Sequence, residues 1–250
     1  MSLSEKNHHK RDDRIKFDEG PHIYWVDGKK MDISVTKWVH SHFTHFDANK
    51  IIDKMMKSRK WKQSKYFGKT KEEIKQQWNQ NGKEASEAGT KLHYDIECFY
   101  NGKKIDNDSI EYKQFLSFNE KIGSKLKPYR TEWTVFDEEL NISGSIDMIF
   151  EDVDGSLLIY DWKRSKGIKK SNYYDSSITE CINHLPDSNF WHYALQLNTY
   201  RMILERKYGK KVSGMFLVSL HPIQDTWKRL TVPFLDDEMN DLIQLRLAKL

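Results

Sequence analysis

Two aspartates and a lysine occur where two neighbouring strands are expected. Asp147 lies in the first of these strands, and Asp161 and Lys163 end the second. Residues i and i+2 of a strand point to the same side, so Asp161 and Lys163 share a face. The turn at Asp154-Gly155 would bring the two carboxylates together, and such a pair is costly unless a cation such as Mg²⁺ or Mn²⁺ neutralises it. A surface ion pair between Asp161 and Lys163 is the simpler interpretation of this string alone.

Polar pairs spaced four residues apart occur on two expected helices. His93 and Glu97 lie one turn apart on the first helix. Gln196 and Tyr200 form the second pair, at positions where an apolar core stripe would be expected. Taken singly, a helical histidine is usually a core or surface residue, and a helix-stabilising contact is the simpler interpretation of the second pair.

The order of these elements along the chain is more specific than any one of them. The chain carries G-x-x-L-H-x-x-x-E from Gly89, a further acid at Glu132, G-x-x-D ending at Asp147, D-x-K at Asp161 and Q-x-x-x-Y at Gln196. This order resembles the RecB-like branch of the PD-(D/E)XK nuclease superfamily. It is most similar to enzymes of the mitochondrial genome maintenance exonuclease type.

The resemblance implies an α/β fold, with a restriction-endonuclease-like core in which helices flank a mixed central β-sheet, plus a helical N-terminal elaboration. It also implies a metal-dependent phosphodiesterase. Asp147, Asp161 and the main-chain carbonyl of Trp162 would hold the metal, and His93 would complete its coordination. Lys163 would orient or deprotonate the attacking water, and Glu132 would support the metal. The resemblance further assigns Gln196 and Tyr200 to holding the substrate strand and ordering the lysine.

The chemistry of phosphodiester cleavage agrees with this set. Negative charge builds up at phosphorus, and a cation held by carboxylates stabilises it. We expect Mg²⁺ or Mn²⁺ as the cofactor. The two cysteines, Cys98 and Cys181, are too few for an iron–sulfur cluster held by four cysteines, and no Walker A string indicates ATP use.

Basic charge is concentrated in one part of the chain. The whole sequence has 41 Lys and Arg against 37 Asp and Glu, but the stretch from Lys50 to Lys91 has twelve basic and five acidic residues. Aromatic residues lie among these lysines, as in grooves that bind single-stranded nucleic acid. A solvated helix face with core aromatics is the alternative. The candidate nucleic-acid contacts are Trp61, Lys62, Lys65, Tyr66, Phe67, Trp78, Arg164, Ser165, Lys169, Gln196 and Tyr200.

Hydrophobic periodicity and turn residues predict the order of elements. Strands are expected over 22–26, 31–36, 129–136, 141–150, 157–162, 212–220 and 227–232, and helices over 38–45, 48–57, 71–79, 84–100, 110–122, 189–208 and from 236. We expect a polar tail over 1–16 and one nuclease domain over 17–250. Within it, 17–88 would be the hairpin and basic elaboration, 89–235 the catalytic core and 236–250 a C-terminal helix.

The function that these features favour is a metal-dependent deoxyribonuclease, a single-stranded DNA exonuclease of replication, recombination or repair. An RNA endonuclease of cap-snatching type and a non-catalytic nucleic-acid-binding module remain alternatives. The mean hydropathy of −0.80 and the polar N-terminus argue against a membrane partner and against secretion. Few cysteines favour an intracellular, reducing compartment, and we assume a monomer.

Overall fold

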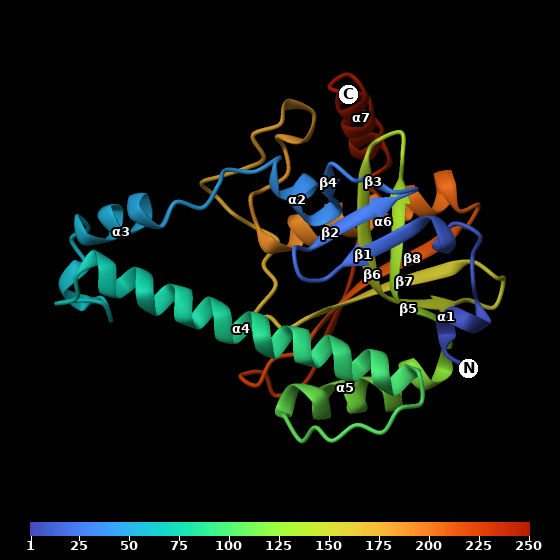
Figure 1. The fold of residues 1–250 in the computed structure, drawn as a ribbon. Coiled ribbons are helices and arrows are strands. Elements are labelled where there is room, and N and C mark those ends of the chain that lie inside the picture. Colours follow the sequence, from blue (N-terminus) through green and yellow to red (C-terminus); the bar gives the residue numbers. More distant parts are fainter. The chain divides into compact units, whose positions relative to one another are not determined.

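The chain folds into two compact units. The computed structural model describes residues 1–250; one unit comprises Met1–Thr44 with Leu92–Leu250, and the other comprises His45–Lys91. The first unit contains the main β-sheet and the helices on its two faces (Figure 1). No helix is both long enough and apolar enough to cross a bilayer.

The main sheet is mixed, as expected for this fold class. Its strands are β4 (Ile33–Ser34), β5 (Lys127–Asp137), β6 (Ile142–Glu151), β7 (Leu157–Lys163), β8 (Val212–Ser219) and β9 (Lys228–Thr231). Strand β5 runs antiparallel along one edge of β6, while β4 and β7 both pair with the other edge. Strand β8 is parallel to β7 and antiparallel to β9. This arrangement confirms the expected α/β architecture.

Strands β6 and β7 stop pairing before β7 ends. Their last antiparallel pair is Met148 with Tyr160, and β4 occupies the same edge of β6 only at Ile142 and Ser143. The last three residues of β7, from Asp161 to Lys163, pair with β8 alone. The sheet therefore opens on one side of β7 at the position where the predicted acids lie.

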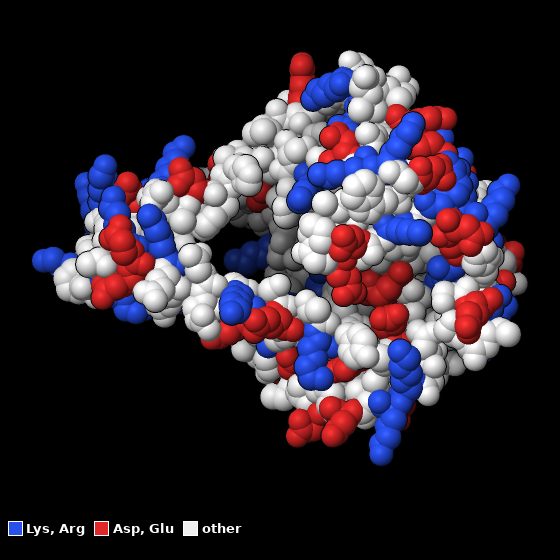
Figure 2. Space-filling view, viewed as in Figure 1, with Lys and Arg blue, Asp and Glu red and all other residues white.

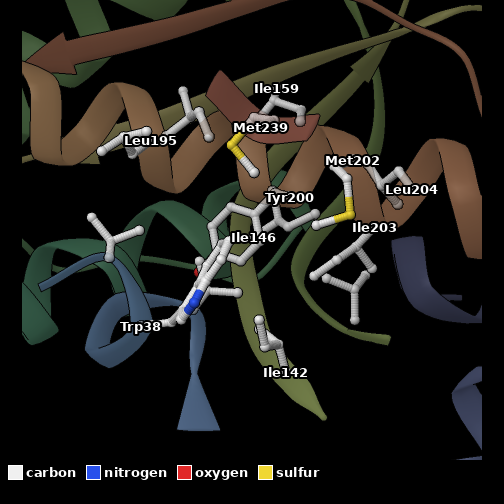
Figure 3. Close-up of a cluster of buried hydrophobic side chains, with 14 of the residues drawn as sticks. Trp38, Ile142, Ile146, Ile159, Leu195, Tyr200, Met202, Ile203, Leu204 and Met239 are labelled. Atoms are coloured by element: carbon white, nitrogen blue, oxygen red, sulfur yellow. The ribbon is translucent and has the colours of Figure 1, made fainter. Parts of the chain in front are cut away.

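Helices cover both faces of the sheet. On one face, α5 (Ile110–Lys121) and the C-terminal part of α4 (Lys71–Tyr100) pack on alternate residues of β7, including Tyr160 and Trp162. On the other face lie α2 (Val35–His40), α6 (Asn189–Lys207) and α7 (Asp236–Leu247). Figure 3 shows the core on this second face, with the ring of Tyr200 among apolar side chains from the sheet and from α2.

The N-terminal segment adds a small sheet. It contains α1 (Leu3–Lys6), the 3₁₀ turn η1 (Asp12–Arg14) and the strands β1 (Ile15–Asp18), β2 (Ile23–Val26) and β3 (Lys29–Lys30). The expected hairpin at Asp27-Gly28 is present, and both turn residues have positive φ as a type I′ turn requires. Its second arm is shorter than predicted, because Ile33–Ser34 pairs with β6 in the main sheet.

The first sixteen residues, expected as a polar tail, are bound to the rest of the first unit by ion pairs and hydrogen bonds. Arg130 binds Asp12 at 2.7 Å, and the guanidinium of Arg11 donates to the carbonyl of Phe136 and to Glu138. Burial opposes ionisation of Glu138, yet the hydrogen bond from Arg11 prevails and lowers the pKa of this carboxyl to about 2.

The second unit is helical. It contains α3 (Ala48–Met56), the 3₁₀ turn η2 (Trp61–Gln63) and the start of α4. The sequence predicted two helices, over 71–79 and 84–100, but α4 is continuous from Lys71 to Tyr100. The polar run between them, 80–83, contains Gly82, and a glycine costs a helix only about 1 kcal/mol, which the flanking turns outweigh. Two further 3₁₀ turns, η3 (Gly123–Lys125) and η4 (Glu180–Ile182), complete the described elements.

Candidate active site

The two predicted aspartates lie where β6 and β7 separate. Because Trp162 has no partner on β6, its amide donates a hydrogen bond to Oδ2 of Asp147 at 2.9 Å. Asp161 follows Ile159 on the face of β7 that packs against α6, and its side chain is only 3% exposed. The Asp147 side chain is 11% exposed. Two acidic side chains are therefore held in a nearly dry part of the sheet.

His93 brings an imidazole to the same place from α4. Its Nε2 lies 2.8 Å from the main-chain carbonyl oxygen of Trp162, and its Nδ1 lies 3.5 Å from Oδ2 of Asp147. That carbonyl is available because the strand β6 has turned away. The imidazole and the carbonyl are two of the four ligands that the sequence predicts.

Glu132 approaches from β5. The pairs on either side of it, Thr131 with Met148 and Trp133 with Ile146, set Glu132 opposite Asp147. Its φ is 43°, a left-handed conformation that costs about 1–3 kcal/mol in a non-glycine residue, and strained residues of this kind cluster at functional sites. The hydroxyl of Ser145 donates to its carboxylate at 3.0 Å. The backbone is thus strained where Glu132 enters the cluster.

Three of these side chains form a set that could hold a metal ion, and Asp161, predicted as a ligand, is outside this set and pairs with Lys163 instead. His93, Glu132 and Asp147 each offer one ligand atom, and the three atoms lie within 4.8 Å of one another. Carboxylate oxygens suit Mg²⁺ and Mn²⁺, while an imidazole nitrogen favours Mn²⁺ over Mg²⁺. The donor set therefore fits a divalent cation of this class.

Lys163 lies between an acid, an amide and a ring. Its Nζ is 2.7 Å from Oδ2 of Asp161, 3.5 Å from Oε1 of Gln196 and 4.5 Å from the ring centroid of Tyr193. Gln196 in turn donates to the hydroxyl of Tyr200 at 3.4 Å. Tyr193 and Gln196 therefore lie on one face of α6 next to the ammonium group, and Tyr200 contacts it only through Gln196.

Burial and charge shift the pKa values in this cluster. Burial raises the pKa of Asp161 to about 6, although the neighbouring Lys163 opposes this. Burial alone would lower the pKa of Lys163, but the carboxylates of Asp161 and Asp147 prevail and raise it. Burial would likewise lower the pKa of His93, yet Asp147 and Glu132 raise it to about 9. The raised pKa values of His93 and Lys163 favour their charged forms, while burial raises the pKa values of Asp147 and Asp161 and favours the neutral acids.

Three residues that surround the candidate active site were not predicted from the sequence. Tyr193 lies three residues before Gln196, a spacing that places both on one helix face, and this spacing could have identified it. Gly144 matters because a Cβ there would lie 2.9 Å from Cε1 of Tyr200. Tyr24 of β2 is buried, which raises its pKa to about 12, and the charge of Glu132 acts in the same direction. No local pattern connects the small N-terminal sheet with Glu132.

The predicted nucleic-acid contacts divide into two groups. In the second unit, Trp78 donates to the hydroxyl of Tyr66 at 2.9 Å, and the rings of Trp61 and Phe67 meet edge to face. Trp61 also lines a hollow of about 280 Å³ together with Met55, Ser58, Lys60, Gln63 and Ser64. Figure 2 shows Lys and Arg side chains standing out on α3 and on the start of α4. Lys62 and Lys65 are exposed there.

The other group follows β7. Arg164 is held by Glu111 at 2.6 Å, so its charge is already paired within the first unit. Ser165 exchanges hydrogen bonds with the backbone of Gly167, and Lys169 is exposed. Glu97, on α4, lies at the margin of the cluster, where burial and the charge of Glu132 raise its pKa.

Comparison with known proteins gives one family match. The sequence profile described as the PD-(D/E)XK nuclease superfamily matches residues 37–249. No curated protein matches the chain. The crystal structure of SSO0001 aligns with 56% of this chain at 16% identity and a TM-score of 0.29; the chain covers 54% of that protein, about half its length. A protein named "Putative exonuclease" from Eubacterium rectale aligns with 62% of this chain at 12% identity and a TM-score of 0.30, over 70% of its own length.

Proposed function

Since the chain belongs to the PD-(D/E)XK nuclease superfamily, we propose that it is a metal-dependent deoxyribonuclease that degrades single-stranded DNA from an end. Its role would lie in DNA replication, recombination or repair. In this proposal residues 17–250 form one nuclease domain, and the helical stretch rich in lysine belongs to its substrate-binding part. The protein would act as a monomer in a reducing, intracellular compartment.

The separation of β6 from β7 is the observation that carries the proposal. It leaves the carbonyl of Trp162 free of the sheet beside the carboxylate of Asp147, with the imidazole of His93 at 2.8 Å from that carbonyl. Asp147, Asp161, Trp162 and His93 would hold Mg²⁺ or Mn²⁺, with Glu132 as a further acid next to them. When bound, the cation would activate water and stabilise the charge that develops on the phosphate.

Lys163 would supply the positive donor to the attacking water or to the phosphate oxygens. The carboxylates of Asp161 and Asp147 raise its pKa and a bound cation would lower it again, so Lys163 would orient or deprotonate the water. Gln196 and Tyr193 would keep the ammonium group near the metal when Asp161 turns to the cation. Tyr200, hydrogen-bonded to Gln196, would fix that side chain and contact the substrate strand.

The preference for single strands rests on the second unit. Its aromatic rings and lysines match the two kinds of contact that single-strand grooves use, with bases stacking on rings and phosphates meeting ammonium groups. Because every base has a flat face, such a surface binds many sequences. We therefore propose little sequence preference and an affinity that falls with salt.

The test is digestion of matched labelled substrates with Mn²⁺ present. Linear single-stranded DNA should be degraded, whereas duplex DNA, RNA and a covalently closed single-stranded circle of the same sequence should persist much longer. Equal digestion of circle and line would make the enzyme an endonuclease. Preferential digestion of RNA would replace the DNA substrate by RNA, and binding without any cleavage would favour a non-catalytic module.

A further inference from the structure

The segment between β7 and α6 begins at Lys163 and ends at the helix that carries Gln196. Its first part is fixed to the start of α6, because the amide of Lys169 donates to Oδ1 of Asn189 at 2.8 Å and the indole of Trp191 donates to the carbonyl of Lys170 at 2.9 Å. Figure 1 shows this segment, coloured from yellow to orange, passing outside the sheet and helices. It is therefore an ordered surface segment attached at both ends to the candidate active site.

The middle of the segment forms a closed turn. Oδ1 of Asn172 accepts hydrogen bonds from the amides of Tyr174 and Asp175, and its amide group donates to the carbonyl of Asp187. The amide of Asp187 returns a bond to the carbonyl of Asp175 at 2.9 Å. These bonds satisfy the backbone and leave the two tyrosine side chains outside it.

The side chains of Tyr173 and Tyr174 contribute almost nothing to the core. They are 89% and 92% exposed, the highest values among the aromatic residues of the chain. Neighbouring exposed rings on an ordered turn indicate a contact with another molecule rather than a role in folding. The two rings therefore mark a contact surface for another molecule, whose class remains to be identified from the neighbouring residues.

The charges of the same segment indicate which class of molecule binds there. From Arg164 to Tyr174 there are four basic residues and no acid; Arg164 is paired with Glu111, while Lys166, Lys169 and Lys170 are exposed. Asp175 and Asp187 lie in the closed turn next to the tyrosines. Exposed rings next to three exposed lysines suit a chain of bases and phosphates better than an apolar protein surface. The partner is therefore a single-stranded nucleic acid.

The spacing agrees with one strand that reaches the active site. The amide of Phe190 donates to the carbonyl of Lys169, and Gln196 follows six residues later on the same helix. At 1.5 Å per residue this is about 9 Å along the helix axis, which corresponds to two or three nucleotides at 3.4 Å each. The tyrosines lie further along the segment.

Resting on the proposed function, we propose that residues 166–174 form a substrate track, a surface on the first unit that binds the DNA strand next to the active site. The lysines of the track bind phosphates next to the cleavage site, and Tyr173 and Tyr174 stack on bases a few nucleotides away. Substrates too short to reach the tyrosines would not sense them.

The experiment measures binding of fluorescent oligothymidylates to the Asp161→Asn protein with Ca²⁺ present. Replacing both tyrosines by alanine (Tyr173→Ala, Tyr174→Ala) should raise the Kd of a 15-nucleotide strand by roughly 5- to 150-fold for each base that stacks. The Kd of a three-nucleotide strand should not change. Replacing both by phenylalanine keeps the rings and should keep the affinity. Ile223→Ala, a change at a 65% exposed apolar residue outside the segment, serves as the control.

Two failures are distinguishable. If the alanine variant binds the long strand as tightly as the Asp161→Asn parent, while the wild type cleaves DNA, the track is refuted and the nuclease remains. If the wild type neither binds nor cleaves any nucleic acid, both the proposed function and the track are refuted. Circular dichroism of the variants checks that they fold, which the exposure of both rings leads us to expect.

Discussion

Gly144 offers a test of how closely the fold sets the position of Tyr200. The glycine lies in β6, three residues before Asp147, and Tyr200 packs over it from α6. A Cβ at this position would lie 2.9 Å from Cε1 and 3.0 Å from the hydroxyl oxygen of Tyr200, and 3.1 Å from Cγ2 of Val35. Favourable contacts between carbon atoms lie at about 3.5–4.0 Å. Gly144→Ala therefore forces at least one neighbour to move.

Neither neighbour can move freely. Val35 is fully buried and Tyr200 is 3% exposed, its ring surrounded by the core side chains of Figure 3. Overpacking of this kind costs about 1–3 kcal/mol, and for a domain of 150–250 residues each kcal/mol lowers Tm by about 2–4 °C. We expect a fall in Tm of about 2–12 °C. Because Gln196 bonds to the hydroxyl of Tyr200, kcat should fall as well.

Thermal unfolding and steady-state cleavage measure the two effects on the same protein. Gly20→Ala is the matched control, since a Cβ at that exposed turn position meets only Oδ1 of Asp18 at 3.7 Å and its φ lies outside the left-handed region. The control should change stability by less than about 0.5 kcal/mol and leave kcat unaltered. If Gly144→Ala behaves like Gly20→Ala in both assays, the close packing of Tyr200 on β6 is not what positions it.

The remaining predictions concern other positions. Tyr193→Leu should lower kcat by about 2- to 30-fold with little change in KM, because the ring of Tyr193 holds the ammonium group of Lys163. Tyr193→Phe keeps the ring and should retain activity. An equal loss of kcat in both variants would reject this role. Trp61→Ala should raise the Kd for single-stranded DNA by about 5- to 150-fold while maximal rate changes less, as anisotropy and single-turnover rates would show. Burial lowers the pKa of His42 to about 4. This imidazole is therefore protonated near pH 6.5 in the unfolded chain but stays neutral in the folded protein. The contribution of His42 to stability is therefore complete above pH 6.5 and falls as the pH drops toward 4. Between pH 7 and pH 5, urea unfolding of the wild type should show a loss of about 2 kcal/mol in the free energy of unfolding that His42→Gln lacks. An identical loss in both proteins would contradict this role of His42.

The strands that carry the candidate site could be predicted because local signals agree there. The runs around Asp147 and Asp161 are apolar and are joined by an Asp-Gly turn, and the structure places them as β6 and β7. The long helix with Gln196 is buried on most sides and has no clear apolar stripe, but a run without glycine or proline over 189–208 and a glycine after its end predict it. These features depend on neighbouring residues alone.

Other features depend on contacts between distant segments. Strand β4 has two residues and exists only because β6 offers a free edge beside Ile142. The left-handed φ of Glu132 lies inside a strand and has no local signature. The cation–π contact of Tyr193 requires α6 to cross the end of β7. Sequence reasoning misses such features because tertiary packing creates them.

The central claim is that Asp161 belongs to a metal site that cleaves DNA. Its most direct test is the cleavage rate of end-labelled single-stranded DNA against Mn²⁺ concentration, for the wild type, Asp161→Asn and Asp225→Asn. Asp225 is exposed and lies in the loop before β9, so its substitution controls for the loss of one negative charge. We predict saturating curves that coincide for the wild type and Asp225→Asn, and no cleavage above the EDTA background for Asp161→Asn. Cleavage by Asp161→Asn along the wild-type curve, or full wild-type activity in excess EDTA, would contradict the account.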